Sequence, residues 1–316
     1  MSNLAISGGT PLINGAFSPY RTIGGEEIDA VVEVLKSGTL SRFIGTSTPE
    51  FYGGPKVNEF ERAWENHFQV KYAISVNSWT SGLIAAVGAI GIEPGDEVIL
   101  PPWTMSACAA AILAWNAIPI FADISYDNFC LDPVDVKNKI TSRTRAILSV
   151  DIFGQSAPIT EIMELAKNND IMVISDAAQS PGARVADGFA GTLSHVGGFS
   201  LNYHKHIHTG EGGMIVTNDE SIARRLQLIR NHAESVVKGM GITKLDNMIG
   251  FNFRMGEIEA AIGIEQLKKL DALVLKRQQA AARLRGGLET LPGLTCPQVS
   301  ETNTHVYYIF GMKIDS

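Results

Sequence analysis

Between residues 25 and 230 the sequence alternates short runs of β-branched and other apolar residues with longer segments of helical periodicity. Strands that alternate with helices build a parallel sheet, because each helix carries the chain back across one face before the next strand begins. The predicted strands are residues 73–76, 97–100, 118–124, 146–153, 172–178, 196–201 and 214–218. The fold class is therefore α/β, with a mostly parallel seven-stranded sheet sandwiched by helices.

The helical periodicity also indicates how the chain divides into domains. The predicted helices are residues 26–35, 57–68, 81–90, 106–114, 159–168, 220–231 and 255–290. After residue 231 the alternation stops and a Gly- and Met-rich connector precedes the last helix, while a length of 316 residues suits about two domains. We predict a large domain over residues 13–245 and a smaller C-terminal α/β domain over residues 246–316, together with residues 1–12.

Charge and cysteine content exclude several classes of protein. The chain has 33 acidic and 26 basic residues and no long basic run, so nucleic acid is a poor partner. No stretch reaches the ~18 apolar residues of a membrane span. The first residues, MSNLAISGGTPLING, have neither a basic n-region nor an apolar core, so we expect no signal peptide. Cys108, Cys130 and Cys296 lack the spacing of a disulfide framework or a zinc site. We expect a cytoplasmic protein that binds no membrane and no metal.

Ligands of open α/β sheets bind beyond the carboxyl ends of the strands, and polar residues follow three of the predicted strands. In VNSWTSGL, Asn77, Ser78 and Thr80 come directly before a helix, whose free N–H groups and dipole favour an anion such as phosphate. The alternative is a Ser or Thr cap that serves only the helix.

The second polar point is Asp176 in VISDAAQSPGA, directly after a predicted strand. A buried carboxylate needs partners, and in a cofactor enzyme it can keep a pyridine nitrogen protonated so that the ring withdraws electrons. The alternative is an aspartate that caps the following helix.

The third polar point is Lys205 in FSLNYHKHIHTGEGG, where it stands among His204, His206 and His208 and before a glycine-rich turn. An amine is nucleophilic only without its proton, and desolvation or nearby positive charge lowers its pKa, as Schiff-base chemistry requires. A lone lysine is usually a surface residue. Together with Asp176, Ser200 and the turn at Ser78, however, Lys205 predicts a cofactor site.

Seven segments in the same order give this chain a wider resemblance, which runs from residue 4 to about residue 312. They are LAISGGTPL, GDEVILPPWT, IPIFADI, SDAAQSPGA, FSLNYHKHIHTGEGGMIVTND, IRNHA and GFNFRMGEIEAAIGIEQLKKL. The sequence resembles the DegT/DnrJ/StrS sugar aminotransferases, which bind pyridoxal 5′-phosphate (PLP) and have the fold type I of aspartate aminotransferase. The resemblance implies that fold, PLP as cofactor, and a homodimer with shared active sites.

The resemblance also implies roles for single residues. Lys205 matches the lysine that carries the cofactor as a Schiff base, Asp176 the partner of the pyridinium nitrogen, and Gln179 the residue beside the phenolic oxygen. The phosphate cradle would consist of Ser78, Trp79, Thr80 and Ser200. Asn252, in GFNFR, matches the asparagine that reaches the phosphate of the neighbouring subunit's cofactor.

Three positions depart from the family pattern. Trp79 replaces the glycine that lets the backbone approach the phosphate, so we expect a reshaped cradle. The aromatic residue that stacks on the cofactor has no clear counterpart, and Trp103 and Met105 are the candidates. Relatives continue beyond the strand that HVYYIFGMKI would form, so we expect the small domain to be incomplete and this strand to lack its sheet partners.

Lys205 also distinguishes between the reactions of the family. Relatives that dehydrate a sugar carry histidine at this position, so lysine favours transamination from glutamate or glutamine to a nucleotide-linked keto sugar or a cyclitol ketone. The alternatives are a PLP-dependent dehydratase and a PLP-binding regulatory homologue without catalysis. A nicotinamide dehydrogenase is disfavoured, because no G-x-G-x-x-G follows the first strand.

Overall fold

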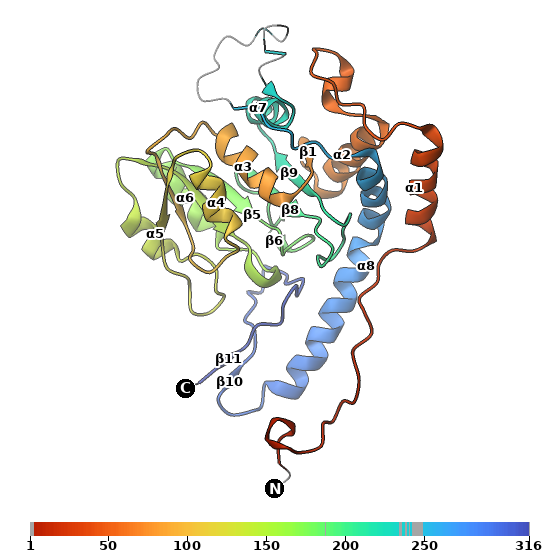
Figure 1. The fold of residues 1–316 in the computed structure, drawn as a ribbon. Helices are drawn as coiled ribbons and strands as arrows, with labels where there is room; N and C mark the ends of the chain where they lie inside the picture. The colour runs from red at the N-terminus through yellow and green to blue at the C-terminus, as the bar shows by residue number, and fades with distance from the viewer. Residues whose placement is uncertain are drawn as a thin grey trace.

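The computed structural model describes residues 3–186, 188–233, 236, 237, 239, 241 and 249–315. At its centre is a seven-stranded sheet with the strand order β1-β9-β8-β5-β4-β2-β3 (Figure 1). Neighbouring strands are parallel, except that β9 runs antiparallel to both β1 and β8. The strands of this sheet are β1 Tyr72–Val76, β2 Glu97–Leu100, β3 Ile118–Phe121, β4 Thr144–Val150, β5 Met172–Asp176, β8 Val196–Ser200 and β9 Gly213–Thr217. All seven predicted strands are confirmed, and with them the mostly parallel α/β sheet.

Helices connect and cover these strands. The α-helices of the described residues are α1 Gly25–Ser37, α2 Pro55–Phe68, α3 Trp79–Ala89, α4 Ala107–Leu113, α5 Pro133–Lys139, α6 Ile159–Asn169, α7 Glu220–Arg230 and α8 Glu257–Leu288. Short 3₁₀ turns are η1 Ala5–Ser7, η2 Pro49–Tyr52 and η3 Ile152–Gly154, and two small ladders pair β6 Arg184–Val185 with β7 Gly188–Phe189 and β10 Leu294–Thr295 with β11 Lys313–Ile314. Among the described α-helices, α5 is the one that the sequence did not predict. Its N-cap is Asp132, whose side chain accepts a hydrogen bond from the Val134 N–H.

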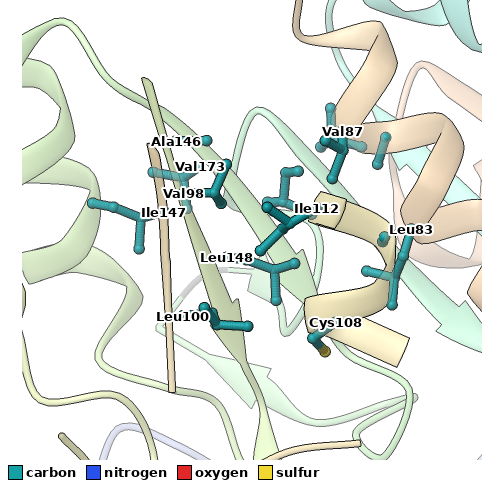
Figure 2. Packing of buried hydrophobic residues seen from close by; sticks show 14 of the residues in the cluster. Leu83, Val87, Val98, Leu100, Cys108, Ile112, Ala146, Ile147, Leu148 and Val173 are labelled. Carbon is teal, nitrogen blue, oxygen red and sulfur yellow. The ribbon is translucent and has the colours of Figure 1, made fainter. Parts of the chain in front are cut away.

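Each face of the sheet carries a hydrophobic core. Ile215 of β9 packs in the cluster that includes residues of α3 and α4, and Figure 2 shows Ile112 of α4 near Leu148 of β4. Met214, the neighbour of Ile215, packs in the other cluster with residues of α2 and α8. Strands covered on both faces read as continuous apolar runs, and this explains why short runs such as MIVT predicted the strands well.

The long helix α8 packs its first half against the rest of the fold. Ala260, Ile264 and Leu267 share a core cluster with Phe60 and Trp64 of α2. The predicted domain boundary at residue 245 falls within residues 242–248, which lie outside the described residues, so the division into domains stays a prediction. Within the part of the chain that the structure describes, no helix combines the length and apolar character needed to cross a membrane.

The predicted C-terminal strand over HVYYIFGMKI is wrong for most of its length, since only Lys313–Ile314 is extended, as β11. The preceding residues bond to the 3₁₀ turn η3 instead of a sheet: the Val306 N–H donates to the Gly154 carbonyl at 2.7 Å and the Ile309 N–H to the Phe153 carbonyl at 3.1 Å. Tyr307 has a φ of 49°, which interrupts any extended run. These contacts place residues 305–309 against the large sheet, and Val306 is fully buried.

His206 fastens this C-terminal segment to the loop that carries Lys205. Its Nε2 lies 2.9 Å from the Val306 carbonyl oxygen, and the side chain is fully buried. Burial, chiefly, lowers the pKa of His206 to about 3. The imidazole is therefore neutral in the folded protein over the ordinary pH range, with its proton on the nitrogen that faces Val306.

A buried ion pair joins α7 to α2 and contacts β1 through Ser75. The guanidinium of Arg230 is fully buried and pairs with Glu61, which also accepts hydrogen bonds from the N–H and hydroxyl of Ser75. Arg230 donates further to the carbonyl oxygens of Ser75 and Tyr52. A pair of this kind costs most when one partner is removed, because the other charge stays buried.

We expect Arg230→Met to lower the free energy of unfolding by about 3–5 kcal/mol, since Glu61 loses its counter-charge inside the protein. Arg224→Met is the matched control on the same helix, because Arg224 forms an exposed pair with Glu220 and its loss should cost at most about 1 kcal/mol. Guanidinium unfolding followed by circular dichroism measures both. Equal losses of stability in the two variants would contradict the stabilising role of the buried Arg230–Glu61 pair.

His206 predicts a pH dependence of stability. An unfolded histidine binds a proton below a pKa of about 6.5, whereas folded His206 stays neutral down to about 3, so its contribution is lost as the pH falls through this window. Between pH 6 and pH 4 the free energy of unfolding of the wild type should fall by about 1.4 kcal/mol per pH unit more than that of His206→Gln. The side-chain amide of this variant can still donate to Val306. Parallel stability curves for the two proteins would exclude this role.

Candidate active site

A cavity of about 260 Å³ opens at the carboxyl ends of β5 and β8, beside the N-terminus of α3. Asp176 is the last residue of β5 and Ser200 the last of β8, while Lys205 lies in the turn that leads from β8 to β9. These strands are neighbours in the sheet, so their ends meet at one edge. The site therefore lies where the fold class predicts it.

Most of the predicted site residues line this one cavity. They are Ser78, Trp79, Thr80, Met105, Asp176, Gln179, Ser200 and Lys205. Trp103 and Asn252 do not line it: the Trp103 side chain is 53% exposed, and Asn252 is an exposed residue whose Oδ1 accepts a hydrogen bond from Arg254. Of the two candidates for the stacking position, only Met105 borders the cavity.

Ser78 is the N-cap of α3. Its hydroxyl oxygen accepts a hydrogen bond from the Ser81 N–H at 3.1 Å, so the capping interpretation of this serine is confirmed. Capping does not exclude the phosphate interpretation, because the other N–H groups of a first helical turn have no partner within the helix. Trp79 and Thr80 are the first residues of α3, and their N–H groups carry the positive end of its dipole toward the cavity.

The Trp79 indole points into the protein interior. Its side chain is only 5% exposed, and Nε1 donates a hydrogen bond to Asp176 Oδ1 at 2.7 Å. The indole is thus turned toward the carboxylate of Asp176, while the Trp79 backbone begins α3 at the edge of the cavity.

Asp176 is buried and well supplied with donors. Besides the indole of Trp79, the Ala178 N–H donates to Oδ1 at 3.0 Å and the Cys108 thiol to Oδ2 at 3.2 Å. The bond to Ala178 is a local turn interaction, and the structure places no helix directly after Asp176 that it could cap. A carboxylate held in this way, with one side open to the cavity, suits a ligand that offers a hydrogen-bond donor or a positive charge.

Lys205 presents a buried amine to the same cavity. The residue is 8% exposed, and Nζ lies 4.5 Å from the ring centroid of Tyr308. Burial lowers the pKa of Lys205, and the charge of Asp176 opposes this effect. No ion pair holds the amine among the described residues. An amine that loses its proton easily is a nucleophile for a carbonyl group and can move a proton at a neighbouring carbon.

The three histidines around Lys205 have different environments. His204 lines the cavity and is exposed as a residue, while partial burial of its imidazole, followed by the charge of Lys205, lowers its pKa. His206 is the buried structural residue described above. His208 lies outside the cavity lining, where its Nδ1 accepts a hydrogen bond from the Gly210 N–H. Only His204 can therefore meet a ligand in this cavity.

Several lining residues were not predicted. Tyr308 comes from the C-terminal segment, and nothing in its local sequence separates it from the core-facing residues of an expected strand. Thr104 also lines the cavity and lies 3.1 Å from the Cys108 sulfur. Cys108 does not line the cavity but donates to Asp176, and its apolar helix gave no sequence signal of this contact.

The cavity thus joins a buried amine, the N-terminus of a helix and a buried carboxylate. These features fit a compound with an aldehyde, a phosphate and a basic ring nitrogen, and PLP has all three.

The family model described as the DegT/DnrJ/EryC1/StrS aminotransferase family matches residues 21–316. The chain is 33% identical to GDP-perosamine synthase of Caulobacter vibrioides, over 92% of this chain and 75% of that protein. It is 32% identical to the L-glutamine:2-deoxy-scyllo-inosose aminotransferase of Streptomyces fradiae, over 99% of this chain and 74% of that protein.

Solved structures agree. S. venezuelae DesV in complex with a ketimine intermediate superposes with a TM-score of 0.82 at 32% identity, covering 92% of this chain and 74% of that one. The E. coli GDP-4-keto-6-deoxy-D-mannose-3-dehydratase with bound hydrated PLP gives a TM-score of 0.82 at 28% identity, covering 94% and 78%. The fold is thus that of the PLP transferases, and the chain belongs to the DegT/DnrJ/EryC1/StrS aminotransferase family.

Proposed function

We propose that this chain is a PLP-dependent aminotransferase that moves an amino group from glutamate or glutamine to a nucleotide-linked keto sugar or a cyclitol ketone. The observation that carries the proposal is the buried amine of Lys205, which shares one cavity with Asp176 and the N-terminus of α3. The two named relatives support the two classes of acceptor, one as a GDP-sugar enzyme and the other as a cyclitol enzyme.

Each group would have one task in this reaction. Bound PLP withdraws electrons from the α-carbon of an attached amino acid. The first turn of α3, with Ser78, Thr80 and Ser200, would bind the phosphate, and Asp176 would keep the proton on the ring nitrogen. By the family resemblance, Gln179 would lie beside the phenolic oxygen. Lys205 would hold the cofactor through its Nζ. Once the amino group of the donor has displaced it from that link, the freed Nζ would be the base that takes the proton from the α-carbon of the donor.

Lys205 also favours amino transfer over dehydration. The E. coli dehydratase has the same fold, so the fold does not separate the two reactions. The resemblance implies histidine at this position in the dehydrating relatives. A lysine amine can form a Schiff base with an aldehyde and so displace an aminated product, whereas a histidine side chain cannot. The alternative is a regulatory homologue that binds PLP without catalysing a reaction. Amino donors distinguish the two, because they convert the cofactor only in an aminotransferase.

We further propose a homodimer with shared active sites. Asn252 supports it, because this residue is exposed outside its own chain's cavity while the neighbouring Phe253 N–H is fixed to the Arg230 carbonyl at 2.9 Å.

Cys108, Cys130 and Cys296 are free thiols, which suits the predicted cytoplasmic location.

Borohydride reduction of the PLP-treated protein should attach the cofactor to Lys205, as read by peptide mass spectrometry. Glutamate or glutamine should convert the bound cofactor to its amine form, and a keto sugar or cyclitol ketone should gain an amino group. Lys205→Ala should lose the attachment and at least about 10²–10⁴-fold in turnover, whereas Lys36→Ala, at an exposed site, should match the wild type.

Two results would contradict the proposal. A cofactor that attaches to Lys205 but responds to no amino donor would indicate the regulatory homologue. A sugar product that has lost its hydroxyl group without gaining nitrogen would indicate the dehydratase.

The lowered pKa of Lys205 predicts its reactivity in the cofactor-free protein. As the pH rises, Lys205 should lose its proton before the exposed lysines do, because burial disfavours its charged form. Acetic anhydride labelling across a pH series, read by peptide mass spectrometry, should give Lys205 a lower midpoint. In Asp176→Asn the midpoint should fall further, since the opposing charge is gone. A midpoint equal to that of the exposed lysines would contradict the prediction.

A further inference from the structure

The carboxylate of Asp176 has nearly all of its acceptor capacity occupied by the protein itself. Two carboxylate oxygens offer about four acceptor positions. The Trp79 indole and the Ala178 N–H occupy Oδ1, and the Cys108 thiol occupies one position on Oδ2. The remaining position belongs to Oδ2. A donor on a bound cofactor would therefore meet a carboxylate that is already fixed in orientation.

The indole of Trp79 fits because two glycines leave room for it. A Cβ atom at Gly198 of β8 would lie 2.0 Å from the indole Cζ3, and one at Gly82 of α3 would lie 2.5 Å from its Cε3. Either methyl group would force the ring to move. The sequence thus combines a tryptophan at the start of α3 with glycines at the two positions that the ring covers, and the ring is directed at Asp176 as a result.

Cys108 completes the set of donors from a third element. Burial, with the charge of Asp176 as a further cause, raises the pKa of the Cys108 thiol well above its ordinary value. The sulfur therefore keeps its proton and donates it to Oδ2, while the Thr104 hydroxyl, 3.1 Å away, can donate to the sulfur. Helices α3 and α4 both point a donor at the end of β5.

Donors to a carboxylate stabilise its ionised form, so a proton shared with a ring nitrogen is held on the nitrogen. We propose that Trp79 is a positioning residue that, through Asp176, fixes the proton on the pyridine nitrogen of the cofactor. This inference rests on the proposed function. It gives the indole a task other than the phosphate contact that its place in the sequence suggests.

The test compares the wild type with Trp79→Phe, which keeps an aromatic ring but has no N–H. Both proteins are loaded with PLP labelled with ¹⁵N in the ring, and the nitrogen resonance is recorded across a pH series. In Trp79→Phe the resonance should move toward that of neutral pyridine, and PLP should bind about tenfold more weakly, as expected for a lost hydrogen bond to a charged group. A packing role alone would leave the protonation of the nitrogen unchanged.

Trp64→Phe is the matched control, since Trp64 is also buried but its Nε1 has no partner among the described residues. Its nitrogen resonance should equal that of the wild type. If Trp79→Phe does not fold, 3-benzothienylalanine at position 79 decides the question, because it keeps the indole shape and replaces the N–H by sulfur.

The two proposals fail in different ways. A folded variant at position 79 that carries PLP on Lys205 with the wild-type nitrogen resonance overturns the role of Trp79 and leaves the aminotransferase proposal intact. A wild-type protein that does not attach PLP to Lys205 overturns the proposed function, and the inference with it.

Discussion

A carboxylate buried at the end of β5 must find hydrogen-bond donors, and much of the site depends on how Asp176 finds them. Without donors, burial of this charge would cost several kcal/mol. The donors come from α3 through Trp79, from α4 through Cys108, and from the turn after β5 through Ala178. The helix N-terminus that would bind a phosphate and the carboxylate that would meet a ring nitrogen are thereby fixed relative to each other.

Lys205 is positioned by segments that are distant in the sequence. The Tyr20 hydroxyl donates to the carbonyl of His206, next to the lysine, and His206 in turn bonds the carbonyl of Val306. The N-terminal segment and the C-terminal segment therefore meet at the loop between β8 and β9. Tyr308, from that C-terminal segment, covers the lysine amine with its ring, so the burial that lowers the pKa of Lys205 is partly tertiary in origin.

The sequence predicts the strands and site residues that depend on a local pattern. It does not predict side-chain directions or segment positions that depend on contacts with distant residues. Strands covered on both faces are continuous apolar runs, and the polar residues after them, such as Asp176 and Ser200, fall at one edge by topology alone. The direction of the Trp79 ring depends on Gly198, far along the chain, and no local pattern reveals it. The segment around Tyr308 has the composition of a strand but bonds to backbone groups of residues 153 and 154 in the 3₁₀ turn η3, which lies far away in the sequence.

Two acids lie side by side at the ends of β4 and β5, and their surroundings give them different properties. Asp151 is fully buried and its carboxylate accepts from the Ala157 N–H and the Ser175 hydroxyl, and burial raises its pKa to about 7. It does not line the cavity, and its N–H is bonded to the Asp176 carbonyl. Below neutral pH a protonated Asp151 adds no second negative charge beside Asp176. Different surroundings give neighbouring acids different protonation behaviour within one fold. Here the indole of Trp79 and the thiol of Cys108 donate to Asp176, the acid that faces the cavity.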